Sequence, residues 1–126
     1  MASQAAADAL QRLRGESYIS LATYRRNGQA VHTPVWFAEH DGKLYVMTRD
    51  DSWKYKRLRN NPRVQVAPCT ARGRVTGPAA DGAARVLPNE EEAPAREALA
   101  RKYWLLRLPW LWSKRNRFLE IVLDGA

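Results

Sequence analysis

A short stretch in the middle of the chain combines a polar turn with several basic residues, and this pattern is typical of an anion site. Leu44 to Met47 is an apolar run that indicates the end of a buried strand, and Thr48 to Ser52 is a polar turn. Residues 52–60 are expected to form a short helix, with Asp51 or Ser52 as its N-cap and Asn61-Pro62 as its stop. A helix N-terminus presents unpaired N–H groups and the positive end of the helix dipole, so it favours a bound anion. The basic residues nearby are Arg49, Lys54, Lys56, Arg57 and Arg59. The stretch therefore predicts a phosphate site, the alternative being that these cations only solvate an exposed helix face.

The residue types that most often support catalysis or metal binding are few and scattered. The chain has two histidines, His32 and His40, and one cysteine, Cys69, so no zinc-like ligand cluster is expected. Pro68 precedes Cys69 and no motif supports activation of the thiol, which favours a structural cysteine. The sequence thus nominates no catalytic residue and no metal site. If the protein is an enzyme, a cofactor is expected to supply the chemistry.

The elements that position the anion site are mostly short strands joined by tight turns. Ser17 to Tyr24 and Gln29 to Ala38 are expected to form a hairpin around Asn27-Gly28, whose residues tolerate positive φ angles. Pro34 lies inside the second strand although it lacks an N–H group, which indicates a sheet edge, a bulge or a ligand against the backbone.

The remaining segments complete a mainly β fold. Further strands are expected at 63–70, 72–76, 83–87 and 117–123, with a turn at Asp81-Gly82. Helices are expected at 5–13 and 89–103, the latter opening with a capping box of Asn89 and Glu92. Six or seven short strands with three peripheral helices indicate an antiparallel β-barrel in a single domain, residues 1–126, whose C-terminal helix and closing strand span about 89–123.

Composition limits the environment and the partners of the chain. A single cysteine and the lack of a secretory signal predict the reducing cytoplasm, and no apolar run is long enough to span a bilayer. The net charge of +8 favours a polyanionic partner: nucleic acid, an anionic membrane or a small phosphorylated molecule. The aromatic and basic run around Trp104, Trp110 and Trp112 leaves four roles open: a pocket wall, a dimer interface, a membrane surface or a nucleic-acid stacking platform.

The order of motifs resembles the pyridoxamine-phosphate-oxidase-like (PPOX-like) split β-barrel superfamily. The segments that carry the resemblance are His32-Thr33-Pro34-Val35-Trp36-Phe37, Leu44-Tyr45-Val46-Met47-Thr48-Arg49, Ser52-x-Lys54 and Asn61-Pro62-Arg63-Val64. Residues 67–73 and 84–87 are similar to the flavin/deazaflavin oxidoreductase branch, above all to its small F420-dependent members common in actinobacteria. The resemblance implies a six-stranded antiparallel split β-barrel of the FMN-binding type. It also implies a homodimer that holds its cofactor at the subunit interface.

The resemblance assigns site residues on both sides of the cofactor. Thr48, Arg49, Ser52 and Lys54 would hold the phosphate. The backbone of Thr33, Pro34 and Val35 would lie along the deazaflavin ring. Ser52 stands where relatives often carry a basic residue, so one charged contact is expected to be missing, and Lys56 and Arg57 are left as contacts to the cofactor tail.

The function implied is hydride transfer between reduced coenzyme F420 and an organic small-molecule acceptor. F420 carries a phosphodiester and an oligoglutamate tail, so a basic domain suits it better than FMN, which carries one phosphate. The alternatives are an FMN-binding oxidoreductase of the same fold, a non-catalytic F420 carrier and, from a different class, a basic barrel that binds nucleic acid. Within the family assignment, no nucleic acid is expected as a partner.

Overall fold

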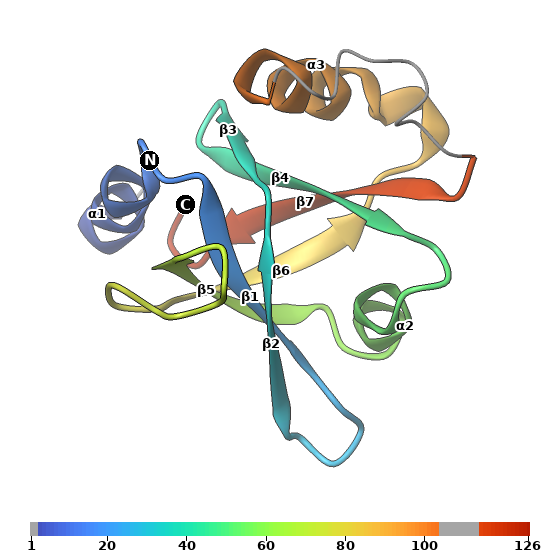
Figure 1. The fold of residues 1–126 in the computed structure, drawn as a ribbon, viewed down its shortest axis with the longest axis horizontal. Helices are drawn as coiled ribbons and strands as arrows, with labels where there is room; N and C mark the ends of the chain where they lie inside the picture. The colour runs from blue at the N-terminus through green and yellow to red at the C-terminus, as the bar shows by residue number, and fades with distance from the viewer. Residues whose placement is uncertain (1–2, 104–113) are drawn as a thin grey trace.

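Seven antiparallel strands form one sheet that curls on itself in the computed structural model, which describes residues 3–103 and 114–126 (Figure 1). The strands are β1 (Tyr18–Tyr24), β2 (Ala30–Val35), β3 (Ala38–His40), β4 (Lys43–Arg49), β5 (Arg63–Cys69), β6 (Ala80–Val86) and β7 (Asn116–Leu123). Their order in the sheet is β2-β1-β5-β6-β7-β4-β3. Because β2 and β3 follow each other in the chain yet lie at opposite ends of this order, the sheet has to curl into a split barrel. The mainly β, split-barrel fold is confirmed.

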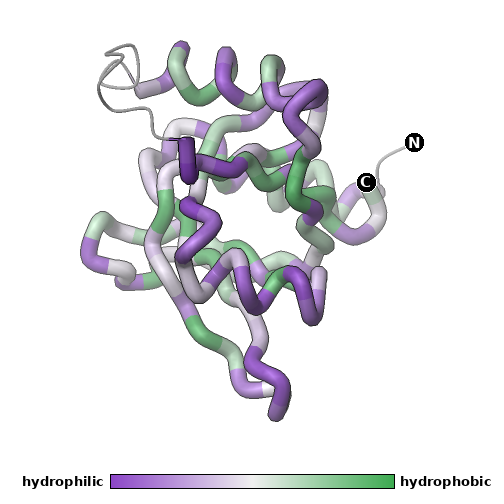
Figure 2. Tube along the Cα trace, turned by 90° about the vertical axis from the view of Figure 1, so that its right-hand side faces the viewer, coloured by the Kyte–Doolittle hydropathy of each residue, from purple (hydrophilic) through white to green (hydrophobic). Residues whose placement is uncertain are grey.

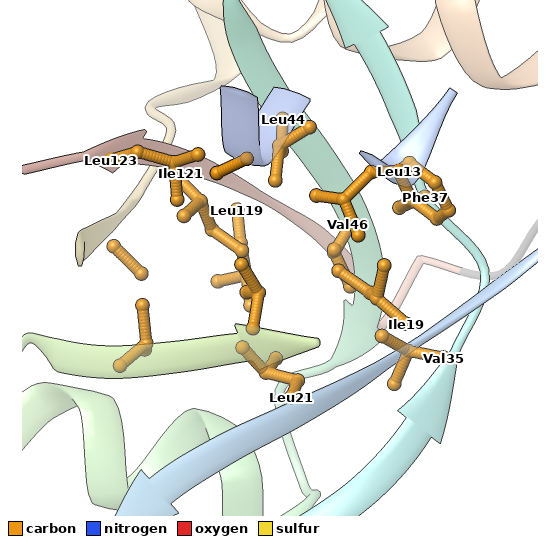
Figure 3. Close-up of a cluster of buried hydrophobic side chains, with 14 of the residues drawn as sticks. Leu13, Ile19, Leu21, Val35, Phe37, Leu44, Val46, Leu119, Ile121 and Leu123 are labelled. Atoms are coloured by element: carbon orange, nitrogen blue, oxygen red, sulfur yellow. The ribbon is translucent and has the colours of Figure 1, made fainter. Parts of the chain in front are cut away.

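The barrel interior holds the main hydrophobic core. Side chains from facing strands point toward one another there, among them Ile19 and Leu21 from β1, Val46 from β4 and Ile121 from β7 (Figure 3). These four side chains are fully buried. Helix α1 (Gln4–Leu13) packs on β5 and adds its apolar face, including Leu13, to this core.

A second, smaller core lies outside the barrel, under the C-terminal helix. Helix α3 (Ala93–Lys102), preceded by the short 3-10 turn η1 (Asn89–Glu91), packs on β3 and β4 (Figure 1). The buried residues of this second core are Ala38, Tyr45, Leu87, Ala95, Ala98, Leu99 and Phe118, with Trp36, Met47 and Tyr103 packed against them. Strand β4 therefore contributes Leu44 and Val46 to the barrel interior and Tyr45 and Met47 to the outer core, as its alternation requires.

Two strand boundaries near the predicted site differ from expectation. The strand predicted at Gln29 to Ala38 is divided into β2 and β3 by Trp36 and Phe37, where the chain passes from one end of the sheet to the other. Strand β4 continues through Thr48 and Arg49, which were expected to form a turn, because both pair with β7 opposite Arg117 and Asn116.

Three predictions in the second half of the chain are wrong. Asp81-Gly82 is not a turn but lies inside β6, where a Cβ on Gly82 would approach the carbonyl oxygen of Val122 to 2.7 Å. Residues 72–76 form a loop with a single bridge between Cys69 and Val75 instead of a strand. Asn89 and Glu92 make no capping box, and helix α3 begins at Ala93 with Pro94 in its first turn.

No helix in the described ranges is long and apolar enough to cross a bilayer. Trp104, Trp110 and Trp112, for which several roles were left open, lie outside the described residues.

Candidate functional site

The predicted strand–turn–helix is present, and a serine at its centre organises the turn. Helix α2 (Trp53–Asn60) has Ser52 as its N-cap, with the Tyr55 N–H donating to Ser52 Oγ over 3.2 Å. Thr48 Oγ1 at the end of β4 lies 3.0 Å from the same Ser52 Oγ. The two hydroxyls thus join the strand end to the helix start. The Ser52 oxygen accepts the capping bond, and one of the two hydroxyl hydrogens is used in the bond between Thr48 and Ser52, so one hydroxyl hydrogen of the pair is left to donate to an anion.

A cavity of about 290 Å³ opens beside this turn. Its lining residues are Val35, Trp36, Met47, Thr48, Arg49, Ser52, Lys54 and Leu99. The set divides into a polar wall, supplied by the end of β4 and the start of α2, and an apolar wall, supplied by the end of β2, by β4 and by α3. This division suits a ligand that has an anionic group at one end and an apolar ring at the other.

Lys54 is the cation of the polar wall that has no anionic partner among the described residues. Its side chain is half-buried, and neither a hydrogen bond nor an ion pair joins its ammonium to another described residue. Burial lowers the pKa of Lys54 below its ordinary value, and the nearby positive charge of Arg57 lowers it further. A half-buried ammonium without a counter-charge favours the binding of an anion, which would supply the missing hydrogen bonds.

Arg49, in contrast, already has an anionic partner. Its guanidinium donates to the Asp51 carboxylate through Nε to Oδ1 at 3.0 Å and Nη2 to Oδ2 at 3.1 Å. This hydrogen bond lowers the pKa of Asp51, so the carboxylate stays ionised and the charge of Arg49 is locally balanced. Arg49 lines the cavity, but it adds less net positive charge there than its residue type suggested.

The structure brings five of the seven predicted site residues together around one cavity: Val35, Thr48, Arg49, Ser52 and Lys54. Thr33 and Pro34 precede Val35 on β2 and are not among the described residues that line it. Pro34 lies on a strand at the end of the sheet order, which confirms the edge position expected of a strand proline. The contact of a ring with the backbone of residues 33–35 stays a prediction.

Three lining residues were not identified from the sequence: Trp36, Met47 and Leu99. The Trp36 ring stacks on Tyr103 at a centroid distance of 4.6 Å and an interplanar angle of 8°. The Tyr103 hydroxyl accepts from the Phe37 N–H at 3.1 Å, and it lies 2.7 Å from the Ser17 carbonyl, to which it donates. Trp36 belongs to the family-like segment at residues 32–37, so the sequence contained a local signal that it could lie at the site. Leu99 had none, because only the packing of α3 brings it to the cavity.

Two of the cations in the basic run face a different cavity. Lys56 and Arg57 line this second cavity and not the one beside Lys54, although Arg57, three residues after Lys54, is close enough to lower the pKa of Lys54. Arg59 lines neither cavity. The run is therefore not one cluster, because the helix distributes its charges over several faces.

The cysteine and the two histidines, the other candidates for chemistry, lie outside the cavity beside α2. Cys69 is buried, and burial raises the pKa of its thiol, so it is poorly suited to act as a nucleophile. His32 is exposed on β2, and His40 Nε2 lies 3.3 Å from the carboxylate of its neighbour Asp41. Within the described ranges, no three His, Cys, Asp or Glu side chains are grouped so as to hold a metal ion.

Solved structures with the same fold differ in what they bind. A conserved hypothetical protein of Mycobacterium tuberculosis aligns with a TM-score of 0.73 and 20% identity, over 98% of this chain and 82% of its own. A FAD-binding protein of Mesorhizobium loti aligns with a TM-score of 0.70 and 22% identity, over 94% and 87%. HutZ, the haem storage protein of Vibrio cholerae, aligns with a TM-score of 0.74 and 10% identity, over 95% and 90%. At these identities the likeness shows a shared fold.

Comparison at the level of sequence is more specific. A search of curated protein sequences gave no match. The family profile described as pyridoxamine 5'-phosphate oxidase matches residues 5–119, which include every strand of the barrel except the last residues of β7. The matched range also contains both walls of the cavity beside α2. The chain therefore belongs to the pyridoxamine 5'-phosphate oxidase family.

Proposed function

We propose that this protein is a cytoplasmic F420-dependent oxidoreductase that transfers a hydride between the deazaflavin coenzyme and an organic acceptor. The observation that carries the proposal is the cavity beside α2. It joins an uncompensated, half-buried Lys54 at a capped helix N-terminus to an apolar wall that includes Trp36 and Leu99. A flavin-type cofactor has the same division, with a flat ring at one end and a phosphate at the other.

The chain's own residues fit such a group. The ammonium of Lys54 and the hydroxyls of Thr48 and Ser52 would hold the phosphate. Val35, Trp36 and Met47 would exclude water from the ring. When bound, the deazaflavin supplies the hydride, and the protein's part is to bind and orient it. No side chain is needed as an acid or base for the hydride step itself.

The choice between F420 and FMN rests on charge. The chain carries a net charge of +8, and F420 has a phosphodiester and a tail of carboxylates, so long-range attraction favours the more anionic coenzyme. FMN is the second candidate, because the cavity itself offers one uncompensated cation, enough for one phosphate. The FAD-binding relative shows that this fold accommodates a flavin in another protein.

The proposal includes a homodimer with the cofactor at the subunit interface. Strand β2 pairs with β1 and lies at one end of the described sheet, so the backbone of Thr33 to Val35 has an edge on which a ring or a second subunit can lie. This placement supports a site that a partner subunit completes.

Titration of the purified protein with F420 and, separately, with FMN tests the cofactor assignment. We expect F420 to bind at micromolar concentration or tighter and Lys54→Ala to weaken it by roughly 10- to 100-fold, since it removes a charge-assisted hydrogen bond. Arg59→Ala is the matched control, because it removes one positive charge from the same helix without touching the cavity. If neither coenzyme binds at micromolar concentration, the oxidoreductase assignment is wrong.

Turnover separates an enzyme from a carrier. Reduced F420 should be oxidised in the presence of quinones, enones or tetrapyrroles, followed by the recovery of F420 absorbance. Binding without oxidation by any acceptor would favour the non-catalytic carrier.

A further inference from the structure

A second and larger cavity, of about 910 Å³, lies on the other side of helix α2. It is lined by Tyr24, Arg25, Arg26, Trp53, Lys56, Arg57, Asn60 and Asn61. Within α2 these positions are i, i+3, i+4 and i+7, so they form one face of the helix. The opposite wall is the end of β1 and the tip of the β1–β2 hairpin, which Figure 2 shows as a hydrophilic projection below the barrel.

The charges of this cavity all have the same sign. Arg25 and Arg26 from the hairpin face Lys56 and Arg57 from the helix, and the described lining residues include no carboxylate. Arg57 Nη1 donates to the buried Thr23 Oγ1 at 3.4 Å, which holds this guanidinium against β1. Four cations with no carboxylate among the described residues that line the cavity make a strong site for a ligand with several negative charges.

Aromatic and amide groups add a second kind of contact. The Trp53 side chain is 69% exposed, and the Lys56 Nζ lies 4.6 Å from its ring centroid. Tyr24 provides another ring on the opposite wall. Asn60 Nδ2 donates to the Lys56 carbonyl and Asn61 Oδ1 accepts from the Arg63 N–H, so the other amide atoms, Asn60 Oδ1 and Asn61 Nδ2, have no partner among the described residues. An exposed ring, an acceptor and a donor are the groups that recognise a flat heterocyclic base.

We propose that this cavity binds a nucleoside polyphosphate, separately from the cofactor site beside Lys54. The base would stack on Trp53, and the phosphates would lie among Arg25, Arg26 and Lys56. The volume is within the range of about 300–1,000 Å³ typical of small-molecule sites and is far larger than one phosphate needs. The described walls of the cavity are one hairpin and one helix, a span that suits a single nucleotide better than a continuous strand of nucleic acid.

Calorimetric titration of the full chain with ATP, ADP, AMP and adenosine tests the proposal. Affinity should decrease in that order, and the preference for ATP should shrink as salt is raised. The double variant Arg25→Ala/Arg26→Ala should weaken ATP by about tenfold or more while changing adenosine little. Trp53→Ala should weaken all four ligands. The charge-matched control Arg12→Ala/Arg72→Ala alters exposed residues that line neither cavity and should leave ATP affinity unchanged.

Three further measurements distinguish this site from its alternatives. ATP should bind equally well to Lys54→Ala and in the presence of saturating FMN. One-for-one competition between ATP and FMN would place the nucleotide in the cofactor cavity and overturn the proposal. It is also overturned if oligo-dT binds and ATP does not. Sedimentation should give the same mass for Arg25→Ala/Arg26→Ala as for the wild type; dissociation of a dimer in this variant would make the face a subunit interface instead.

Discussion

The two sides of helix α2 show how one short helix presents the same type of charge in two different ways. Lys54 lies on the side of the buried Leu58, four residues further along, and its ammonium is half-buried in a cavity of about 290 Å³. Lys56 is exposed and lies on Trp53 in the cavity of about 910 Å³, together with three arginines. Lys54 and Lys56 are two positions apart, yet one is a single half-buried cation and the other belongs to an exposed group of several cations.

This difference indicates that the burial of a cation, more than the number of cations, determines how selectively a site binds one anion over others. A desolvated ammonium with no partner gains strongly from one well-placed anion, because that anion replaces hydrogen bonds lost with water. Exposed cations attract many anions, and salt screens them. The Lys54 side should therefore be selective and tolerate salt, and the Lys56 side should be broader and sensitive to salt.

The largest expected effect comes from reversing one charge on each side. Lys54→Glu should weaken F420 or FMN by about 100-fold or more, because a carboxylate would replace the ammonium and repel the cofactor phosphate in a partly buried site. Lys56→Glu should instead weaken ATP and change flavin affinity by less than about threefold, since its charge is on the far side of the helix and is screened. Fluorescence titrations of both variants with both ligands measure this. Equal losses of flavin affinity would show that the two sides act as one electrostatic surface.

The apolar wall gives the next largest effect. Trp36→Ala removes the ring that stacks on Tyr103 and covers the cavity, and it should weaken flavin binding by about tenfold through lost stacking and burial. Trp36→Phe should recover most of the affinity, because it restores a ring of similar position. ATP affinity should be unchanged in both variants. If Trp36→Ala binds flavin as the wild type does, the ring does not lie on this wall.

Local signals explain which parts of the site were predictable. The N-cap Ser52 and the helix stop Asn61-Pro62 are signals that lie within the helix or directly beside it. The sequence therefore predicts the position of α2 correctly. The pair Asp81-Gly82 predicts a turn from local sequence, whereas the glycine is required by the carbonyl of Val122 on another strand. The place of Leu99 at the cavity likewise depends on three-dimensional packing, so it has no signal in the order of residues. The ion pair of Arg49 with Asp51, in contrast, joins residues two positions apart, so the sequence does contain a local signal for it.

The pH dependence of binding follows from the lowered pKa of Lys54. Burial and the charge of Arg57 bring this pKa below its ordinary 10.5, so the free protein loses the proton at a lower pH than an exposed lysine does. Flavin affinity should fall severalfold as the pH rises from about 7 to about 10, because the neutral amine binds phosphate poorly. Lys54→Arg keeps its charge and should flatten the profile.

The stability of the free protein should move in the opposite direction over the same range. The unfolded chain binds more protons than the native state between the lowered pKa and 10.5, so the free energy of unfolding should rise with pH through this window. Chemical denaturation of the wild type and of Lys54→Met measures the difference. A wild-type profile parallel to that of Lys54→Met would mean that Lys54 is fully solvated.

The smallest expected effect comes from replacing two serines that each cap the N-terminus of a helix. Ser52 accepts from the Tyr55 N–H at the start of α2, and Ser3 accepts from the Ala6 N–H at the start of α1. Ser52→Ala and Ser3→Ala should each lower the free energy of unfolding by about 1 kcal/mol, the usual cost of losing an N-cap. Only Ser52→Ala should also weaken the flavin, by a few fold, because its hydroxyl is bonded to Thr48 inside the cofactor cavity. Equal stability losses with equal flavin affinities would mean that Ser52 caps the helix and does nothing more, leaving the phosphate to Lys54 and the backbone N–H groups of α2.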